Sequence, residues 1–366
     1  MNELSYTVEY DGHLGLYKWQ VVPGARLLTA TLPSLPPNLR VVALGGGTGL
    51  PILLKGLKTA FFPPGRIDGR AGNQNHISAI VTVSDDGGSS GRLRKTYGVL
   101  PPGDIRNCLL ALADVDAKIA AIFDFRFNGS GELTDHSLGN LILTALCELE
   151  KDFARAVERG SEILRVRGQV LPATLDDISL LAEFADGSVV EGESNIASVR
   201  RAIRRVKLKP EAAQAFPAAS RAIEAADLVV IGPGSLYTSL ISILLIQELA
   251  DAIARAKARV VLVMNLMTEP GETEGYSAAD HILAIRRHAP QVPIHDVLFN
   301  MTPIPEEQIE RYGAEGAAPI PVGGEPLRTL GCRPVVRDLL AVGPTVRHDP
   351  YKLAQAVLDL STEKME

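Results

Sequence analysis

A repeated pattern begins at residue 39, in which a short apolar run is followed by a polar loop and then by a helical segment. The apolar runs include 41–44, 77–83, 226–231 and 260–264. Runs of this length predict buried strands, and helices between successive strands predict a parallel sheet. The chain is therefore expected to have an α/β fold with a mainly parallel sheet.

Two segments depart from this repeat. Residues 1–38 contain alternating runs around Asp11-Gly12 and then a proline-rich stretch, which predicts a hairpin, an N-terminal arm and a linker. Residues from about 160 to 210 alternate apolar and polar positions around Asp186-Gly187, which predicts a small insertion that contains a β-hairpin. The core domain is then expected to span 39–346, and residues 347–366 to form a C-terminal helix.

Composition narrows the class of protein. The formal charge of −6 argues against a general nucleic-acid surface, and the basic stretch 199–207 is interpreted as a solvated face. Three distant cysteines predict neither a zinc ribbon nor a disulfide framework. No membrane segment is expected, because the longest apolar region, 228–249, is interrupted by Gly-Pro-Gly-Ser. We expect a cytoplasmic protein and leave open whether it forms a homodimer.

The first strand of the repeat ends in a glycine-rich turn before a helix. Its residues are Gly45, Gly46, Gly47, Thr48 and Gly49. Glycines let a phosphate approach the backbone, and unpaired N–H groups at a helix N-terminus attract negative charge. The turn is not a Walker loop, since no Lys-Ser/Thr pair closes it. It predicts a phosphate site, while a turn that only lets strand and helix pack is the alternative.

An acidic pair follows the second strand. Asp85 and Asp86 are succeeded by small and basic residues, namely Gly87, Gly88, Ser89 and Arg92. Two carboxylates at the end of a buried strand need a cation or hydrogen-bond donors. Mg²⁺ or the hydroxyl groups of a ligand would meet that need. The alternative is that Asp85 caps the next helix and Asp86 lies in a turn.

Two further helix starts carry candidate ligand contacts. Asp104 is expected to cap a helix whose first turn holds Arg106 and Asn107, where a cation opposes the helix dipole and favours an anionic partner. A second helix is expected from 135 to about 159, with His136 and Asn140 on one face. For His136 both a structural role and a ligand contact stay open.

Later strands also end in small or polar residues, at Gly232, Gly234, Ser235 and Asn265. The carboxyl ends of parallel strands meet at one edge of a sheet, where ligands bind at the switch point. Motifs far apart in the sequence are therefore expected to converge there. Two glycine turns with acids, asparagines and arginines suit a phosphorylated, hydroxyl-rich molecule such as a nucleotide or a nucleotide sugar.

Six motifs in order resemble the YvcK-like family, the gluconeogenesis factors of the CofD-like superfamily: GGGTGL, SDDGGSSGRLR, PPGDIRNCL, HSLGNL, IGPGSLYTSL and NLMTEPGETEGYSAADH. The resemblance implies a Rossmann-like three-layer α/β/α sandwich. It also implies a protein that binds uridine-diphosphate sugars, especially UDP-N-acetylglucosamine, and that influences cell shape and growth on gluconeogenic carbon sources. Tyr276 and Arg311 match ligand-contacting positions of the family.

The resemblance leaves two main functional hypotheses. The first is a regulatory protein without catalysis that binds a nucleotide sugar. The second is a Mg²⁺-dependent transferase of the 2-phospho-lactate transferase type, in which Asp85 and Asp86 would hold the metal. The stretch after the acidic pair looks more like the YvcK side of the superfamily, which favours the first hypothesis. An NAD(P) dehydrogenase is a weaker third.

Overall fold

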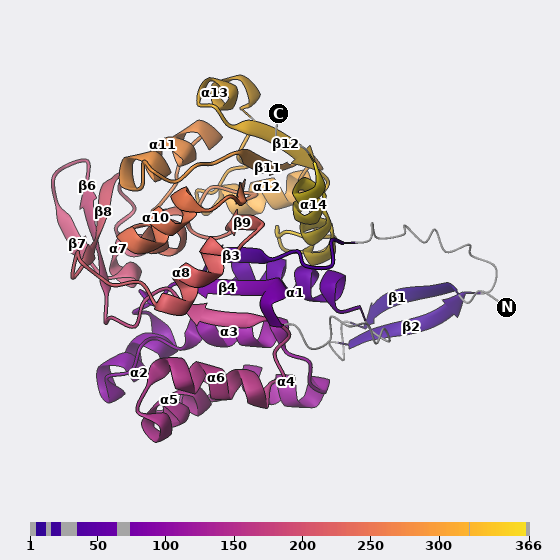
Figure 1. Cartoon of the computed structure of the whole chain (residues 1–366), viewed down its shortest axis with the longest axis vertical. Helices are drawn as coiled ribbons and strands as arrows, with labels where there is room; N and C mark the ends of the chain where they lie inside the picture. The colour runs from indigo at the N-terminus through magenta and orange to yellow at the C-terminus, as the bar shows by residue number, and fades with distance from the viewer. Residues whose placement is uncertain (1–4, 12–15, 23–34, 64–73, 322, 364–366) are drawn as a thin grey trace. The chain divides into compact units, whose positions relative to one another are not determined.

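Seven parallel strands among the described residues form the central sheet of residues 37–366. The computed structural model describes residues 5–11, 16–22, 35–63, 74–321 and 323–363. The strands are β3 (Val41–Gly45), β4 (Ile77–Val81), β5 (Gln169–Pro172), β9 (Leu228–Ile231), β10 (Arg259–Val263), β11 (Asp296–Asn300) and β12 (Arg333–Arg337). Their spatial order is β12-β11-β10-β9-β3-β4-β5 (Figure 1). This is the strand order of a Rossmann-like sheet.

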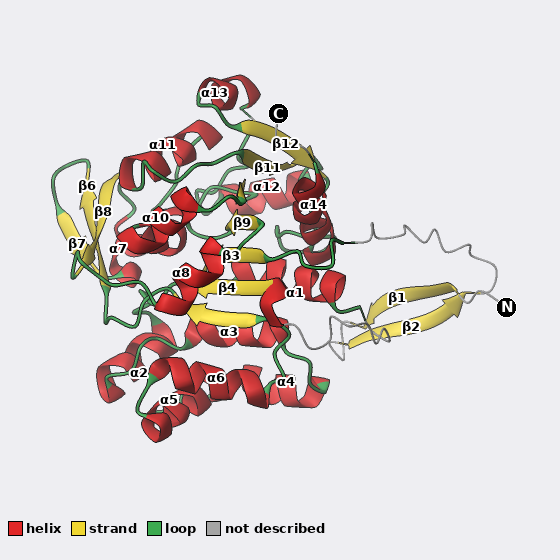
Figure 2. Cartoon of the chain, viewed as in Figure 1, coloured by secondary structure: helices red, strands yellow, loops and turns green. Residues whose placement is uncertain are grey.

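Helices cover both faces of this sheet, which confirms the three-layer α/β/α sandwich (Figure 2). One face packs against α8 (Pro217–Glu224), α10 (Gln247–Arg255) and α11 (Ala278–His288). The other face packs against α1 (Gly49–Phe61) and α3 (Gly103–Leu112), and α14 (Pro350–Thr362) lies beside α1. Because both faces are covered, every residue of β3, β4, β9 and β10 is buried.

The remaining elements of residues 37–366 connect these layers. The predicted helix from 135 to about 159 is wrong as a single helix: α5 ends at Glu150 and α6 begins at Phe153. Lys151 adopts a left-handed conformation with φ of 56°, and the Asp152 carboxylate caps α6 by accepting from the Arg155 N–H. The connecting helices are α2 (Gly88–Tyr97), α4 (Ala117–Asp124), α5 (Leu138–Glu150), α6 (Phe153–Ile163), α7 (Glu193–Val199), α9 (Ser242–Leu244), α12 (Glu306–Gly313) and α13 (Gly324–Thr329), with a 3₁₀ turn η1 (Gln74–His76) and a π-type helix η2 (Leu236–Ile241).

A small antiparallel sheet forms the insertion. It consists of β6 (Ser179–Phe184), β7 (Val189–Glu191) and β8 (Ile203–Lys209). The hairpin predicted at Asp186-Gly187 joins β6 to β7. The predicted start near residue 160 is too early, because α6 packs on the main fold and β5 pairs with β4 at the edge of the main sheet.

Residues 1–36 form a separate compact unit. Its described part is an antiparallel hairpin of β1 (Ser5–Asp11) and β2 (Leu16–Val22), as the alternating pattern predicts. Gly12 of the predicted turn and residues 23–34 lie outside the described residues.

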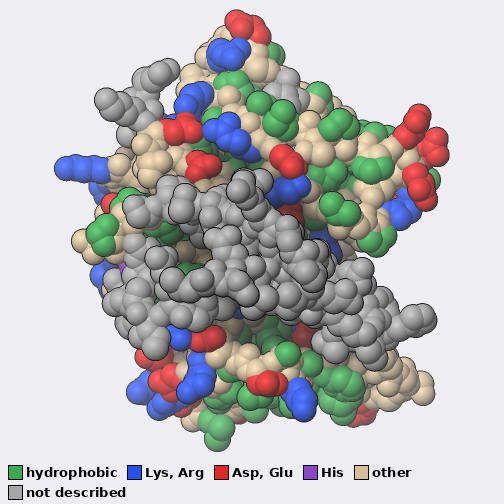
Figure 3. Space-filling view, turned by 90° about the vertical axis from the view of Figure 1, so that its right-hand side faces the viewer, with side chains coloured by type: hydrophobic (Ala, Val, Ile, Leu, Met, Phe, Trp, Pro, Cys, Tyr) green, Lys and Arg blue, Asp and Glu red, His purple; other side chains and the backbone are tan. Residues whose placement is uncertain are grey.

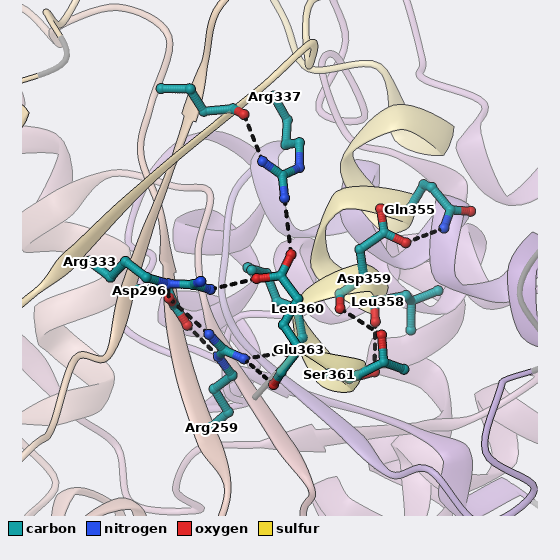
Figure 4. Close-up of polar contacts among 12 residues, drawn as sticks. Arg259, Asp296, Arg333, Arg337, Gln355, Leu358, Asp359, Leu360, Ser361 and Glu363 are labelled. Atoms are coloured by element: carbon teal, nitrogen blue, oxygen red, sulfur yellow. Dashed lines mark hydrogen bonds and ion pairs between the residues drawn. The ribbon is translucent and has the colours of Figure 1, made fainter. Parts of the chain in front are cut away.

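An ion-pair network fixes the C-terminal helix against the strands (Figure 4). The buried Asp296 carboxylate accepts hydrogen bonds from Arg259 at 2.5 Å and from Arg333 at 2.6 Å. Arg259 also donates to the backbone carbonyls of Leu360 and Glu363, at the end of α14. Arg259, Asp296 and Arg333 are the first residues of their strands. The network therefore lies at the amino ends of the strands, and the predicted site lies at their carboxyl ends.

The described surface mixes charged and hydrophobic side chains. On the face shown in Figure 3, basic and acidic side chains of the described residues are interspersed with hydrophobic ones. Among the described residues, no single helix has the length and apolar character needed to cross a membrane. One pair of helical segments, Leu236–Leu244 and Gln247–Arg255, meets those criteria together but is bent by 74°.

Candidate functional site

The turn after β3 requires glycine at two positions because the chain packs closely there. A Cβ atom on Gly46 would lie 2.5 Å from the Asp104 carboxylate, and one on Gly49 would lie 2.4 Å from the Pro233 carbonyl oxygen. Gly47 has a positive φ of 60° with open space around its Cβ position. Packing therefore explains Gly46 and Gly49, while Gly47 and the exposed Thr48 face open space.

A pocket of about 310 Å³ lies at the carboxyl ends of β3, β9 and β10. Its walls are the turn after β3, the turn after β9, the loop after β10 and a segment near α14. The strand order reverses between β3 and β9, which is where open α/β sheets bind ligands. The sequence-predicted residues that line it are Gly46, Gly47, Thr48, Gly49, Gly234, Ser235 and Asn265.

Gly45 and Gly232 do not line the pocket. Gly45 is the last residue of β3, and the Gly232 N–H donates to the Leu44 carbonyl at 2.9 Å, which extends the pairing of β9 with β3. Asn265 holds the adjoining turn. Its amide group donates to the Gly234 carbonyl at 3.0 Å and accepts from the Gly234 N–H at 3.2 Å. The predicted strand-end residues are thus brought together at one edge.

Two glutamates in the loop after β10 were not singled out from the sequence. Glu269 lines the pocket and accepts hydrogen bonds from Asn265 and Ser235. Burial, assisted by the charge of Glu272, raises the pKa of Glu269 to about 7. The Glu272 carboxylate accepts from the Tyr237 N–H at 3.1 Å and from the Thr238 hydroxyl at 2.7 Å, at the start of η2. Only their tertiary burial distinguishes these acids from ordinary loop glutamates.

The acidic pair Asp85-Asp86 is held by backbone groups. Asp85 accepts from the Gly87 N–H at 2.8 Å, and Asp86 accepts from the Ser194 N–H at 2.9 Å. The alternative that Asp85 caps α2 and Asp86 lies in a turn is therefore wrong: the N-cap of α2 is Gly87, which has no side-chain cap, and Asp86 bonds a residue far along the chain. Ser194 brings α7 of the insertion against this loop. Within the part of the chain that the structure describes, no group of three or more His, Cys, Asp or Glu side chains is arranged to hold a metal ion.

Other carboxyl groups near the acidic pair have raised pKa values. Burial raises the pKa of Asp104 to about 6; a hydrogen bond from the Gly47 N–H opposes this shift and the charge of Asp85 adds to it. Burial, with the charges of Asp85 and Asp104, raises the pKa of Glu193 to about 9, and its Oε2 atom has no partner. Asp104 makes no side-chain cap for α3, whose N-cap is Pro102, so its predicted capping role is wrong.

Several predicted residues instead bind one another beside α2 and α5. Ser89 lies 2.9 Å from His136 Nδ1, and the Asn140 amide donates to Ser89 at 3.0 Å. The Arg92 guanidinium donates to the Thr134 carbonyl. Gly87 lies against Ser194, and Gly88 begins α2 with a positive φ of 46°. The residues that line the pocket do not include this cluster.

Asn107 contacts the glycine turn, and Arg106 bonds Asn107. Asn107 donates to the Gly47 carbonyl at 3.4 Å and accepts from Arg106 at 2.6 Å. Arg106 is buried, with Nε and Nη1 unpartnered. Burial lowers the pKa of Arg106, and the charge of Asp124 opposes that shift.

Neither of the two positions implied by the resemblance is among the residues that line the pocket. The Tyr276 hydroxyl lies 2.8 Å from that of Tyr237, and its ring packs edge-on against Tyr237 and His281. Arg311 is exposed and lies over the Tyr312 ring, 5.3 Å from its centroid. Tyr312, the next residue, does line the pocket.

Comparisons with known proteins agree with this architecture. The family model described as "2-phospho-L-lactate transferase CofD" matches residues 41–340. A putative gluconeogenesis factor of Nostoc sp. strain PCC 7120 is 47% identical over 87% of this chain and 68% of its own length. The gluconeogenesis factor of Bacillus subtilis is 44% identical over 88% of this chain and 98% of its own. A crystal structure of a UPF0052 family member from Bacillus halodurans is 42% identical, with a TM-score of 0.81 over 87% of this chain and 99% of that one. As the sequence motifs predict, the chain belongs to the CofD family, among the relatives named gluconeogenesis factors.

Proposed function

We propose that this protein binds a nucleotide sugar of the UDP-N-acetylglucosamine type at the pocket between β3, β9 and β10. In this proposal it acts as a regulatory protein of the gluconeogenesis factor kind, linked to growth on gluconeogenic carbon sources and to cell shape. The names of the relatives support the general role. The choice of ligand rests on the pocket.

The observation that carries the proposal is an uncapped helix N-terminus in the pocket wall. Thr48, the N-cap of α1, makes no side-chain cap hydrogen bond, and the first turn of α1 has no acidic residue. Side chains cap α4, α5, α6, α11 and α14, whereas α2, α3, α8 and α10 have no side-chain cap either; α1 differs from these four in that residues of its first turn line the pocket. The first N–H groups of α1 are therefore left for another acceptor, and a phosphate group is the acceptor that a helix N-terminus favours.

Thermal stabilisation by ligands tests the proposal. At a hundredfold excess over Kd, a ligand that binds only the folded protein adds about 2.7 kcal/mol to the free energy of unfolding. We expect UDP-N-acetylglucosamine to raise the Tm more than UDP-glucose, GDP or NADH at equal concentration. An unchanged Tm with UDP-N-acetylglucosamine, beside a clear rise with another nucleotide, would overturn the proposal.

A Mg²⁺-dependent transferase is the second candidate, and the raised carboxyl pKa values favour it. Asp104 and Glu193 have strongly perturbed pKa values and interact electrostatically with Asp85. Clusters of this kind are frequent in active sites. This candidate requires turnover of a nucleotide-activated substrate that depends on Mg²⁺ and is lost in Asp86→Asn. Finding no turnover across a panel of nucleotide conjugates would contradict it.

A further inference from the structure

A second pocket, of about 390 Å³, is lined by residues of α1, α3 and α4 and by Thr48, the N-cap of α1. The first pocket, at the carboxyl ends of β3, β9 and β10, is also lined by Thr48. Asn107, which lines the second pocket, donates to the backbone carbonyl of Gly47, which lines the first. The two pockets therefore meet at the N-terminus of α1, the position proposed for the phosphate groups.

Asp124 supplies an accessible acceptor in the second pocket. It is the last residue of α4, its side chain is exposed, and no described residue donates a hydrogen bond to its carboxylate. The buried Arg106 guanidinium interacts electrostatically with Asp124, which offsets part of the negative charge. An ionised carboxylate only accepts hydrogen bonds, and its lone pairs are open to hydroxyl donors of a ligand.

The rest of the second pocket is lined by the aliphatic side chains of Pro51, Leu110, Ala120 and Ala121. None of its lining residues, all of which the structure describes, is basic or aromatic. A phosphate group there would have no cation beside it, and a nucleobase would have no aromatic ring to pack against. A sugar ring presents both C–H groups and hydroxyl groups, which suit aliphatic side chains beside a carboxylate, and the volume is that of a small-ligand site.

Resting on the proposed function, we propose that the second pocket is the sugar subsite and that Asp124 accepts hydrogen bonds from the hydroxyl groups of the sugar. In a nucleotide sugar the diphosphate lies between the nucleoside and the sugar. With the diphosphate at the N-terminus of α1, which the two pockets share, the nucleoside takes the first pocket and the sugar takes the second. The subsite takes an uncharged hexose or N-acetylhexosamine.

Calorimetric titration with UDP-N-acetylglucosamine and with the β-phosphate methyl ester of UDP tests this subsite. The ester has the same charge and lacks the sugar, so the ratio of the two Kd values measures what the sugar contributes. Asp124→Ala removes the acceptor and Ala121→Leu fills the second pocket, while Ala117→Leu places the same side chain at an exposed position of α4 that does not line it. We expect the wild type and Ala117→Leu to bind the nucleotide sugar about tenfold or more tightly than the ester. In Asp124→Ala and Ala121→Leu we expect this preference to fall to about one or below.

Two results separate failure of this inference from failure of the proposed function. If the wild type binds the nucleotide sugar and the ester equally, or either Asp124→Ala or Ala121→Leu keeps the wild-type preference, the sugar subsite is wrong while nucleotide binding stands. If the wild type binds neither ligand, both are overturned. Circular dichroism and thermal melting check that the variants fold, and the comparison of the two ligands on the wild type needs no variant.

Discussion

Gly47 donates its backbone N–H to the carboxylate of Asp104, which ties the turn after β3 to the first turn of α3. The proposed phosphate site thus lies beside a buried acid whose pKa is raised to about 6. Ionisation of this acid places a negative charge next to a bound anion. The site should therefore respond to pH in a defined direction.

Asp104→Asn should strengthen binding of an anionic ligand at pH 7.5. The asparagine oxygen still accepts from Gly47, but the negative charge is gone. In the wild type we expect affinity to fall as pH rises from about 5 to 7, because Asp104 ionises in that range. The variant should lose most of this dependence, measured by calorimetry at several pH values. Weaker binding by Asp104→Asn at pH 7.5 would show that the carboxylate itself is required.

Glu193→Gln should change how stability depends on pH. The pKa of Glu193 is raised to about 9 in the folded chain from an ordinary value of 4.5, so the folded state holds this proton more tightly than the unfolded state. Its contribution is fully present below about pH 4.5 and is lost as pH rises towards 9. The free energy of unfolding of the wild type, measured by urea titration, should therefore fall relative to that of Glu193→Gln as pH rises from about 4.5 to 9. A wild type that gains stability relative to the variant as pH rises would contradict this.

Gly56→Ala should destabilise the fold although alanine favours helices. A Cβ atom on Gly56 would lie 1.8 Å from the Pro350 carbonyl oxygen, where α1 packs on α14. We expect a loss of about 1–3 kcal/mol in the free energy of unfolding, because a packed interface must shift. Lys55→Ala, at the exposed neighbouring position, is the control and should change stability by less than about 0.5 kcal/mol. Equal stability of both variants would mean that the two helices are not in close contact.

Asp296→Asn should be strongly destabilising without affecting ligand binding. Removing the charge leaves the buried Arg259 without its ion-pair partner, which costs about 3–5 kcal/mol. Glu363→Gln removes a half-exposed partner of Arg333 and should cost about 1 kcal/mol or less. Because Asp296 begins β11 and the pocket lies at the opposite strand ends, nucleotide affinity of the folded variant should stay unchanged. A large change in affinity would contradict this prediction, because it would show that the ion-pair network at the amino ends of the strands influences binding at their carboxyl ends.

Much of the fold was predictable because central parallel strands are buried on both faces and read as continuous apolar runs. The edge strand β5 was assigned to the insertion instead. Its residues alternate between half-buried and buried positions. Strands of an antiparallel sheet show the same two-residue period, so the pattern does not distinguish β5 from the strands of the insertion. The break between α5 and α6 was missed because a lysine, Lys151, takes the left-handed conformation that normally marks a glycine.

The candidate site was predictable where it depends on backbone. Glycine-rich turns can be recognised in the sequence, and the turns after β3 and β9 line one pocket. Side chains whose role depends on tertiary burial were not predictable. Glu269 and Glu272 have no local signal, and His136 and Asn140 both hydrogen-bond Ser89. Sequence spacing alone cannot show which polar groups are already paired.

The central claim is that the N-terminus of α1 holds the phosphate groups of a nucleotide sugar. Thr48 tests it well, because it is exposed, lines the pocket and caps nothing with its side chain. Thr48→Asp places a negative charge at the proposed phosphate position, and Thr48→Asn is its uncharged match.

The decisive measurement is therefore the Kd of UDP-N-acetylglucosamine for the wild type and these two variants at low salt. We expect Thr48→Asn to bind within a few-fold of the wild type and Thr48→Asp to bind about tenfold or more weakly, with all three equally folded. Equal affinity in Thr48→Asp and Thr48→Asn would contradict the claim that α1 holds the phosphates.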